Sequence, residues 1–124
     1  MKRILVVEDY HALADIETLL CQMEGYDVKI AKTGEEGLSL IGSYQPDLVI
    51  LDLMLPGEIS GNQVLDQIRD DGRDSPSVLV VSALVNQTTA PELERHPNVQ
   101  TLPKPFKVKE LAGLIREMVG VEDG

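Results

Sequence analysis

The chain has 124 residues, of which 11 are Lys or Arg and 21 are Asp or Glu, so its formal net charge at pH 7 is −10. This length suits one domain with a single hydrophobic core, and the negative charge argues against direct binding to nucleic acid phosphates or anionic lipid. No apolar run approaches the roughly 18 residues of a membrane span, and the lone Cys21 fits a reducing compartment, so we expect a cytoplasmic protein.

The first half of the chain alternates strand patterns with helical ones. A continuous β-branched run at 4–7 predicts a strand covered on both faces. Alternating apolar and polar residues at 28–31 predict a less buried edge strand, and a short helical pattern follows around Leu38 and Ile41. The helix between these two strands has an apolar face made of Leu13, Ile16, Leu19, Leu20 and Met23, with Cys21 beside it as a small core residue.

The second half continues the same alternation. Runs at 48–51 and 78–81 predict two more central strands, and segment 99–102, which holds two polar residues, predicts the other edge strand. Prolines at 91 and 97 predict a short fourth helix, because Pro is tolerated only in the first turn. Helical spacing joins Val64, Leu65 and Ile68, and later Leu111, Leu114, Ile115, Met118 and Val119.

The predicted order is a strand followed by a helix, five times over. Such alternation with short connections indicates an α/β fold with a parallel sheet, helices on both faces and right-handed crossovers. The sequence contains neither a repeat of fixed period nor an internal linker. We therefore expect one domain over residues 1–120, followed by a frayed tail at 121–124.

Polar side chains follow the ends of these strands. Glu8 and Asp9 come after the first, Asp52 after the third, Ser82 ends the fourth and Lys104 follows the fifth. Sites in open sheets form beyond these strand ends. Crowded carboxylates repel unless a cation is present, and Mg²⁺ binds carboxylates together with phosphoryl oxygens. The pattern suits phosphoryl chemistry, with Asp52 as a nucleophile that forms an acyl phosphate, but spacing alone does not establish it.

Four blocks of this sequence resemble the signature blocks of response-regulator receiver domains. They are V-V-E-D at 6–9, D-L-V-I-L-D-L-M-L-P at 47–56, V-V-S-A at 80–83 and L-P-K-P-F at 102–106, in the family's order and across nearly the whole chain. Four coordinated blocks are far more specific than any one of them. The resemblance implies a flavodoxin-like (βα)₅ doubly wound sheet of strand order 2-1-3-4-5. It also implies a regulatory phosphoacceptor, not an enzyme with a turnover substrate.

The resemblance assigns an acceptor and a metal site. Position by position, Asp52 corresponds to the phosphoacceptor, and Asp9 and the backbone carbonyl of Met54 join it on Mg²⁺. Glu8 would act on the metal through a bound water. Lys104 corresponds to the lysine that contacts the phosphoryl group.

The resemblance also assigns a conformational switch. Ser82 corresponds to the hydroxyl that moves toward the phosphoryl group, and Phe106 to the aromatic partner on the last strand. Pro105 is expected to follow a cis Lys104–Pro105 peptide bond. Output to an effector is expected through the fourth helix, the last strand and the fifth helix, and homodimerisation on phosphorylation is a further expectation.

The expected phosphoryl donor is a phosphohistidine, on a sensor histidine kinase or a histidine phosphotransfer protein. Met54 lies two residues after the acceptor, and Leu84 two after the switch hydroxyl. In the family these positions flank the approach of hydrolytic water, and neither side chain can orient water through a strong hydrogen bond. We therefore expect slow hydrolysis of the Asp52 phosphate. Whether the receiver stands alone or belongs to a larger protein stays open.

Alternative interpretations exist for these residues. Glu8 and Asp9 by themselves would fit a charge pair at a helix N-terminus. A phosphatase of the haloacid-dehalogenase type would need D-x-D after its first strand, whereas here the acceptor follows the third strand and position 54 is Met. An FMN binder would need a hydroxyl- and Gly-rich loop where this chain has E-D-Y-H-A-L-A. A degenerate receiver that only binds proteins is disfavoured, because all five site positions are filled.

Overall fold

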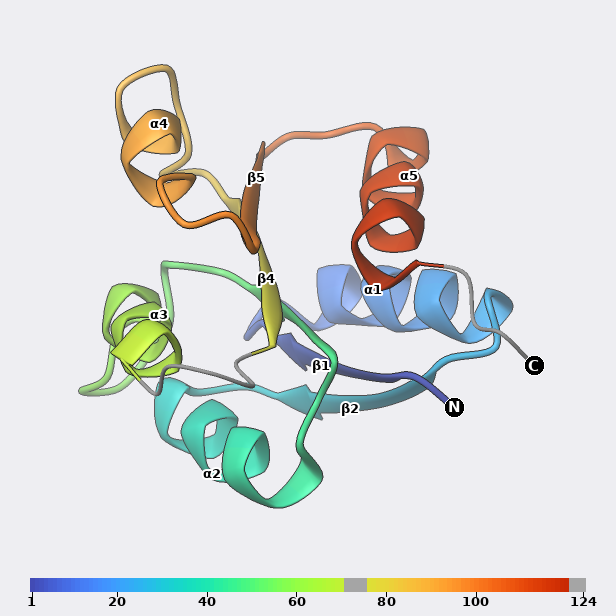
Figure 1. The fold of residues 1–124 in the computed structure, drawn as a ribbon. Coiled ribbons are helices and arrows are strands. Elements are labelled where there is room, and N and C mark those ends of the chain that lie inside the picture. Colours follow the sequence, from blue (N-terminus) through green and yellow to red (C-terminus); the bar gives the residue numbers. More distant parts are fainter. Residues whose placement is uncertain (71–75, 121–124) are drawn as a thin grey trace.

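A sheet of five parallel strands in the order β2-β1-β3-β4-β5 lies between two layers of helices (Figure 1). The computed structural model describes residues 1–70 and 76–120, so the expected tail at 121–124 lies outside the described residues. The strands are β1 (Arg3–Val7), β2 (Asp27–Ala31), β3 (Leu48–Leu51), β4 (Ser77–Ser82) and β5 (Val99–Pro103). The helices are α1 (His11–Met23), α2 (Gly34–Tyr44), α3 (Gly61–Asp70), α4 (Thr89–Leu93) and α5 (Val108–Val119).

The flavodoxin-like fold and its strand order are confirmed. The continuous apolar runs form the central strands β1, β3 and β4, which are buried almost throughout, whereas β2 and β5 are the partly exposed edges. Helix α4 is short, as expected, with five residues, and it ends at Leu93, ahead of Pro97. The alternation of apolar and mixed segments therefore predicted both the order of the elements and their depth in the sheet.

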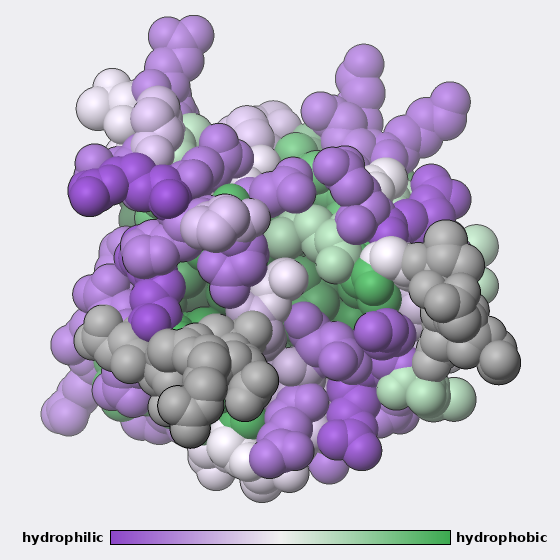
Figure 2. Space-filling view, viewed as in Figure 1, coloured by the Kyte–Doolittle hydropathy of each residue, from purple (hydrophilic) through white to green (hydrophobic). Residues whose placement is uncertain are grey.

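The two faces of the sheet carry separate hydrophobic cores. Helices α1 and α5 cover one face, where Ala14, Cys21, Leu111 and Ile115 are buried, and α2, α3 and α4 cover the other. Figure 2 shows mostly hydrophilic residues on the face viewed there, with hydrophobic ones between them near its middle. Within the described ranges, no helix is both long and apolar enough to cross a membrane.

The expected apolar face of the first helix is wrong for three of its five residues, whereas Leu20 packs against the core as expected. Ile16, Leu19 and Met23 are exposed to 42%, 57% and 74%. The residues of α1 that are buried are Ala14, Glu17 and Cys21. At 100° per residue these two sets lie on nearly opposite sides of the helix. The larger apolar side chains dominated the periodicity, but the stripe that faces the sheet consists of smaller residues and one acid.

Candidate functional site

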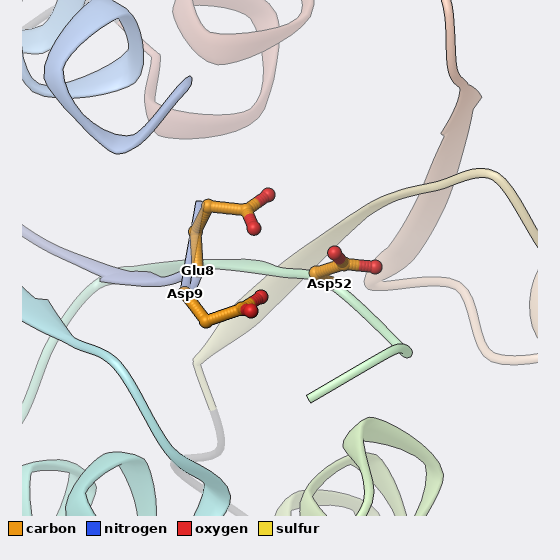
Figure 3. A group of neighbouring side chains, drawn as sticks. All are labelled: Glu8, Asp9 and Asp52. Atoms are coloured by element: carbon orange, nitrogen blue, oxygen red, sulfur yellow. The ribbon is translucent and has the colours of Figure 1, made fainter. Parts of the chain in front are cut away.

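Three carboxylates gather at the carboxyl ends of two neighbouring strands. The register pairs Val7 of β1 with Leu51 of β3, so Glu8 and Asp52 leave the sheet side by side. Each of Glu8, Asp9 and Asp52 offers a carboxylate oxygen, and these oxygens lie within 4.8 Å of one another (Figure 3). Glu8 and Asp52 are buried and Asp9 is exposed. Clustered carboxylate oxygens fit a hard divalent cation such as Mg²⁺.

One lysine joins the two buried acids. The ammonium Nζ of Lys104 donates to Oε1 of Glu8 at 2.9 Å and to Oδ2 of Asp52 at 3.0 Å. The Lys104 backbone N–H donates to the carbonyl of Ser82 at 3.1 Å, which holds this segment against the end of β4. The following Lys104–Pro105 peptide bond is cis, the expected isomer. The lysine that lies 52 residues from Asp52 in sequence is thus its direct ion-pair partner.

Burial and charge act on these groups in opposite directions. Burial raises the pKa of Glu8. Its hydrogen bonds from Lys104 and from the Tyr10 backbone lower the pKa by less, so the pKa stays above its ordinary value. Burial lowers the pKa of Lys104, but its hydrogen bonds to Glu8 and Asp52 raise that pKa by more. Lys104 therefore stays an ammonium at neutral pH and supplies positive charge beside Asp52.

Backbone donors orient the remaining carboxylate oxygens. Oδ1 of Asp52 accepts from the backbone N–H of Met54 at 3.0 Å, and Oε2 of Glu8 accepts from that of Tyr10 at 3.1 Å. The side chain of Met54 is 56% exposed. Since both oxygens of Asp52 have a donor, the carboxylate is fixed in orientation while its lysine partner stays close.

The two residues expected to form the switch, Ser82 and Phe106, stand apart from this hydrogen-bond cluster. Ser82 is fully buried, and its Oγ accepts from the backbone N–H of Leu84 at 3.2 Å. Phe106 was expected on the last strand, but β5 ends at Pro103, and Phe106 lies in the connection to α5, half-buried against the core on the α1 and α5 side of the sheet. The structure thus places Ser82 at the end of β4 without a hydrogen bond to Asp52 among the described residues.

Gly61 is a positioning residue whose role the sequence did not reveal. A Cβ atom at Gly61 would lie 2.3 Å from the carbonyl oxygen of Asp52 and 2.4 Å from Cα of Leu53. The Gly61 N–H donates to the Leu53 carbonyl at 3.1 Å. The first residue of α3 therefore packs directly on the backbone that carries Asp52. The only signal in the sequence was the segment P-G-E-I-S-G at 56–61, and its glycines fit an ordinary turn equally well.

Glu17 is a second residue near this site that the sequence did not single out. It is 1% exposed, and its Oε1 has no hydrogen-bond partner in the described part of the chain. Burial, and then the negative charge of Glu8, raise the pKa of Glu17 to about 8. The helical spacing of Ala14, Glu17 and Cys21 was the one sequence signal for a buried stripe. It was not recognised because a small residue, an acid and a thiol do not form a typical apolar face.

The comparisons with known proteins agree with this geometry. Residues 4–116 match the response regulator receiver domain family. The chain is 36% identical over 121 residues to the DNA-binding dual master transcriptional regulator RpaA of Synechocystis sp., covering 96% of this chain and 49% of RpaA. It is 36% identical over 115 residues to the DNA-binding response regulator MtrA of Mycolicibacterium smegmatis, covering 93% of this chain and 49% of MtrA.

The chain thus spans about half the length of the curated relatives it matches. The expectation that this chain does not bind nucleic acid directly stays a prediction.

Solved structures show the same fold. The receiver domain of NtrX from Brucella abortus superposes with a TM-score of 0.82 at 29% identity, covering 94% of this chain and 97% of that one. A CheY-like receiver domain protein from Methanospirillum hungatei superposes with a TM-score of 0.81 at 28% identity, covering 96% of this chain and 94% of that one. With a family match over nearly its whole length and these neighbours, the chain belongs to the response regulator receiver domain family.

Proposed function

We propose that this receiver takes a phosphoryl group from a phosphohistidine donor onto Asp52. The observation that carries the proposal is the pairing of Asp52 with the Lys104 ammonium at 3.0 Å, within a group of three carboxylates at the end of the sheet. The donor is a sensor histidine kinase or a histidine phosphotransfer protein. The domain catalyses its own modification, and the phosphorylated form is the signal.

The transfer needs a nucleophile and charge on the incoming oxygens. A carboxylate oxygen of Asp52 attacks phosphorus, and the phosphorus–nitrogen bond of the donor breaks with its electron pair returning to the imidazole. Lys104 offers its ammonium to a phosphoryl oxygen, because its Nζ already lies beside Oδ2 of Asp52. The Met54 N–H keeps the other oxygen of Asp52 oriented. The product is an acyl phosphate on Asp52.

Glu8, Asp9 and Asp52 would hold Mg²⁺, with the backbone carbonyl of Met54 as a further ligand. Their clustered oxygens within 4.8 Å are the donor set that a hard cation prefers. When bound, Mg²⁺ supplies positive charge to the phosphoryl oxygens. Glu8 is engaged by Lys104, so its role toward the metal is through a water.

Phosphorylation would bias a two-state element through Ser82 and Phe106. The Oγ of Ser82 now accepts from Leu84 N–H, and a phosphoryl group on Asp52 is a stronger acceptor for the Ser82 hydroxyl. Movement of Ser82 would carry the loop before α4 with it, and Phe106 would repack against the core beside α5. The output surface is then α4, β5 and α5, open to an effector or to a second receiver.

Intact-mass measurement after incubation with acetyl phosphate tests the acceptor. We expect the native protein to gain one phosphoryl group with Mg²⁺ and much less without it, and the adduct to be released by hydroxylamine, as acyl phosphates are. Asp52→Asn should gain none, because its amide is not a nucleophile. Asp66→Asn is the matched control, since Asp66 is an exposed acid of α3 paired with Arg69, and it should behave like the native protein. Phosphorylation of Asp52→Asn at the native rate would contradict the proposal.

A Met54→Asn, Leu84→Glu double variant tests the lifetime of the phosphate. Both native side chains are apolar and exposed, 56% for Met54 and 42% for Leu84, and cannot align an attacking water. We expect the native acyl phosphate to hydrolyse slowly and the double variant to lose it roughly tenfold faster, about 1.4 kcal/mol of barrier. The decay is followed by intact mass after the phosphate donor is removed. Equal decay rates in the two proteins would show that these positions do not limit hydrolysis.

A further inference from the structure

Glu17 is a buried acid on the side of α1 that faces the sheet. Its neighbours along this stripe, Ala14 and Cys21, belong to the hydrophobic core between the sheet, α1 and α5. The side chain is 1% exposed, and its Oε1 has no hydrogen-bond partner within residues 1–70 and 76–120. A buried polar atom without a partner is rare in folded proteins and often marks a functional group or a missing ligand.

The charges that act on Glu17 come from the acidic site. They are the carboxylates of Glu8 and Asp52, which disfavour its ionised form, and the ammonium of Lys104, which favours it. Burial and these charges together raise the pKa of Glu17 to about 8, so its carboxyl group holds a proton at pH 7.

Several charged groups of α1 and of the elements packed against it have partners other than Glu17, among them Asp15, which pairs with His11. On its own helix, Glu24 pairs with Arg116 of α5, and Cys21 is a thiol whose pKa is raised by burial to about 12. In β2, Asp27 and Lys29 engage Tyr44 of α2, which lies on the opposite face of the sheet from α1. The acidic site is therefore the charged neighbourhood to which Glu17 responds.

We propose that Glu17 is a fourth carboxyl group of this site, which holds a proton while Lys104 alone is paired with Glu8 and Asp52 and releases that proton to solvent when a divalent cation binds. This inference rests on the cation-binding part of the proposed function and not on phosphoryl transfer. The step is balanced, because the cation enters and one proton leaves, so the positive charge added is smaller than that of the cation alone.

The physical reason is the low dielectric of the surroundings. Two added positive charges at Glu8, Asp9 and Asp52 offset the repulsion that those carboxylates exert on Glu17, and charges interact strongly where water is excluded. The cation leaves the effect of burial in place but lowers the pKa of Glu17 from its metal-free value, so a larger fraction of Glu17 is ionised near pH 7.5 and metal binding is coupled to proton release. By linkage, the affinity for Mg²⁺ rises with pH up to about 8, the range in which free Glu17 is still protonated.

Isothermal titration calorimetry with MgCl₂ at pH 7.5, in two buffers of different ionisation enthalpy, counts the protons released. We expect the native protein to release roughly half a proton more than Glu17→Gln. Glu8 also has a raised pKa because of its burial, so only the difference between the two proteins reports on Glu17. The Kd for Mg²⁺ should tighten more steeply from pH 6.5 to pH 8 in the native protein than in the variant.

One control variant and one second replacement of Glu17 accompany this measurement. Thr18→Val removes the neighbouring buried hydroxyl, which also lacks a partner in the described chain, and should release as many protons as the native protein. Glu17→Met, an apolar replacement, takes the place of Glu17→Gln if the amide perturbs folding. It too should release fewer protons than the native protein when Mg²⁺ binds. Equal proton release by the native protein and both Glu17 variants would overturn the inference while leaving phosphoryl acceptance, followed by intact mass, untouched. Absence of Mg²⁺ binding would overturn it together with the metal site.

Discussion

Replacing Glu17 with methionine is expected to raise the free energy of unfolding by about 3 kcal/mol at pH 7 in the absence of metal. The native carboxyl group is 1% exposed, and its Oε1 has no partner in the part of the chain that the structure describes. Methionine has a similar length and no polar atom that needs hydration. The substitution therefore removes a proton-uptake requirement without leaving another group unpaired.

The sign follows from proton linkage. Burial raises the pKa of Glu17 from 4.5 to about 8 in the folded protein. Between these two values the unfolded chain has lost the proton and the folded chain keeps it, so native stability falls as pH rises through this window. The slope is about 1.4 kcal/mol per pH unit for one proton. Below the window both states are protonated and above it both are ionised, so the slope vanishes.

Urea unfolding in EDTA at several pH values between 5 and 8 measures this effect. The advantage of Glu17→Met over the native protein should be small at pH 5 and grow toward pH 8. Thr18→Val is the matched control in the same helix, because it removes a buried partnerless hydroxyl that does not titrate, and its effect should be independent of pH. A constant difference between native and Glu17→Met at all pH values would contradict a protonated Glu17.

Gly61→Ala is expected to destabilise the fold by about 2–3 kcal/mol and to slow phosphorylation of Asp52 by at least tenfold. The added methyl group would stand 2.3 Å from the Asp52 carbonyl oxygen, well inside van der Waals contact with the backbone. Either α3 or the loop that carries Asp52 must move. A shift of about 1 Å at a reacting group is enough for a hundredfold loss in rate, and Lys104 and Met54 would lose their alignment on Asp52.

Gly113→Ala is the matched control for this substitution. Gly113 lies inside α5, and a Cβ atom there would meet no atom within 4 Å. Alanine is a better helix former than glycine, so this variant should be stabilised by about 0.5–1 kcal/mol and phosphorylated at the native rate. Urea unfolding and the rate of mass gain with acetyl phosphate measure both effects. A Gly61→Ala variant that unfolds and reacts like Gly113→Ala would show that the close approach carries no constraint.

The fold was predictable because its determinants are local. Continuous apolar runs, mixed edge segments and helical spacing each depend on neighbouring residues, and their order alone restricts the topology of a parallel sheet. The burial of β1, β3 and β4 and the short α4 followed from these patterns. Helix α1 is the exception, because its strongest periodicity, that of Ile16, Leu19 and Met23, marks the exposed side.

The candidate site was predictable in its members but not in its contacts. Parallel strands end at one edge of a sheet, so Glu8, Asp9, Asp52 and Lys104 were expected together, and the structure brings their charged atoms into contact or within 4.8 Å. Ser82 follows the same rule, but its hydroxyl is turned to Leu84. Orientation depends on backbone donors that no residue pattern specifies.

By itself, the sequence determined the class of fold and the residues that meet at the strand ends, because periodicity and strand polarity are properties of short segments. The order of the strands in the sheet came from the resemblance of four sequence blocks to receiver domains. Only the tertiary structure decided that Lys104 bridges Glu8 and Asp52, that Gly61 packs on the backbone of Asp52, and that Glu17 is buried with no partner for its Oε1 in the described chain. These facts arise from the distance at which whole helices and strands pack, and that distance is the result of all the contacts in the core together.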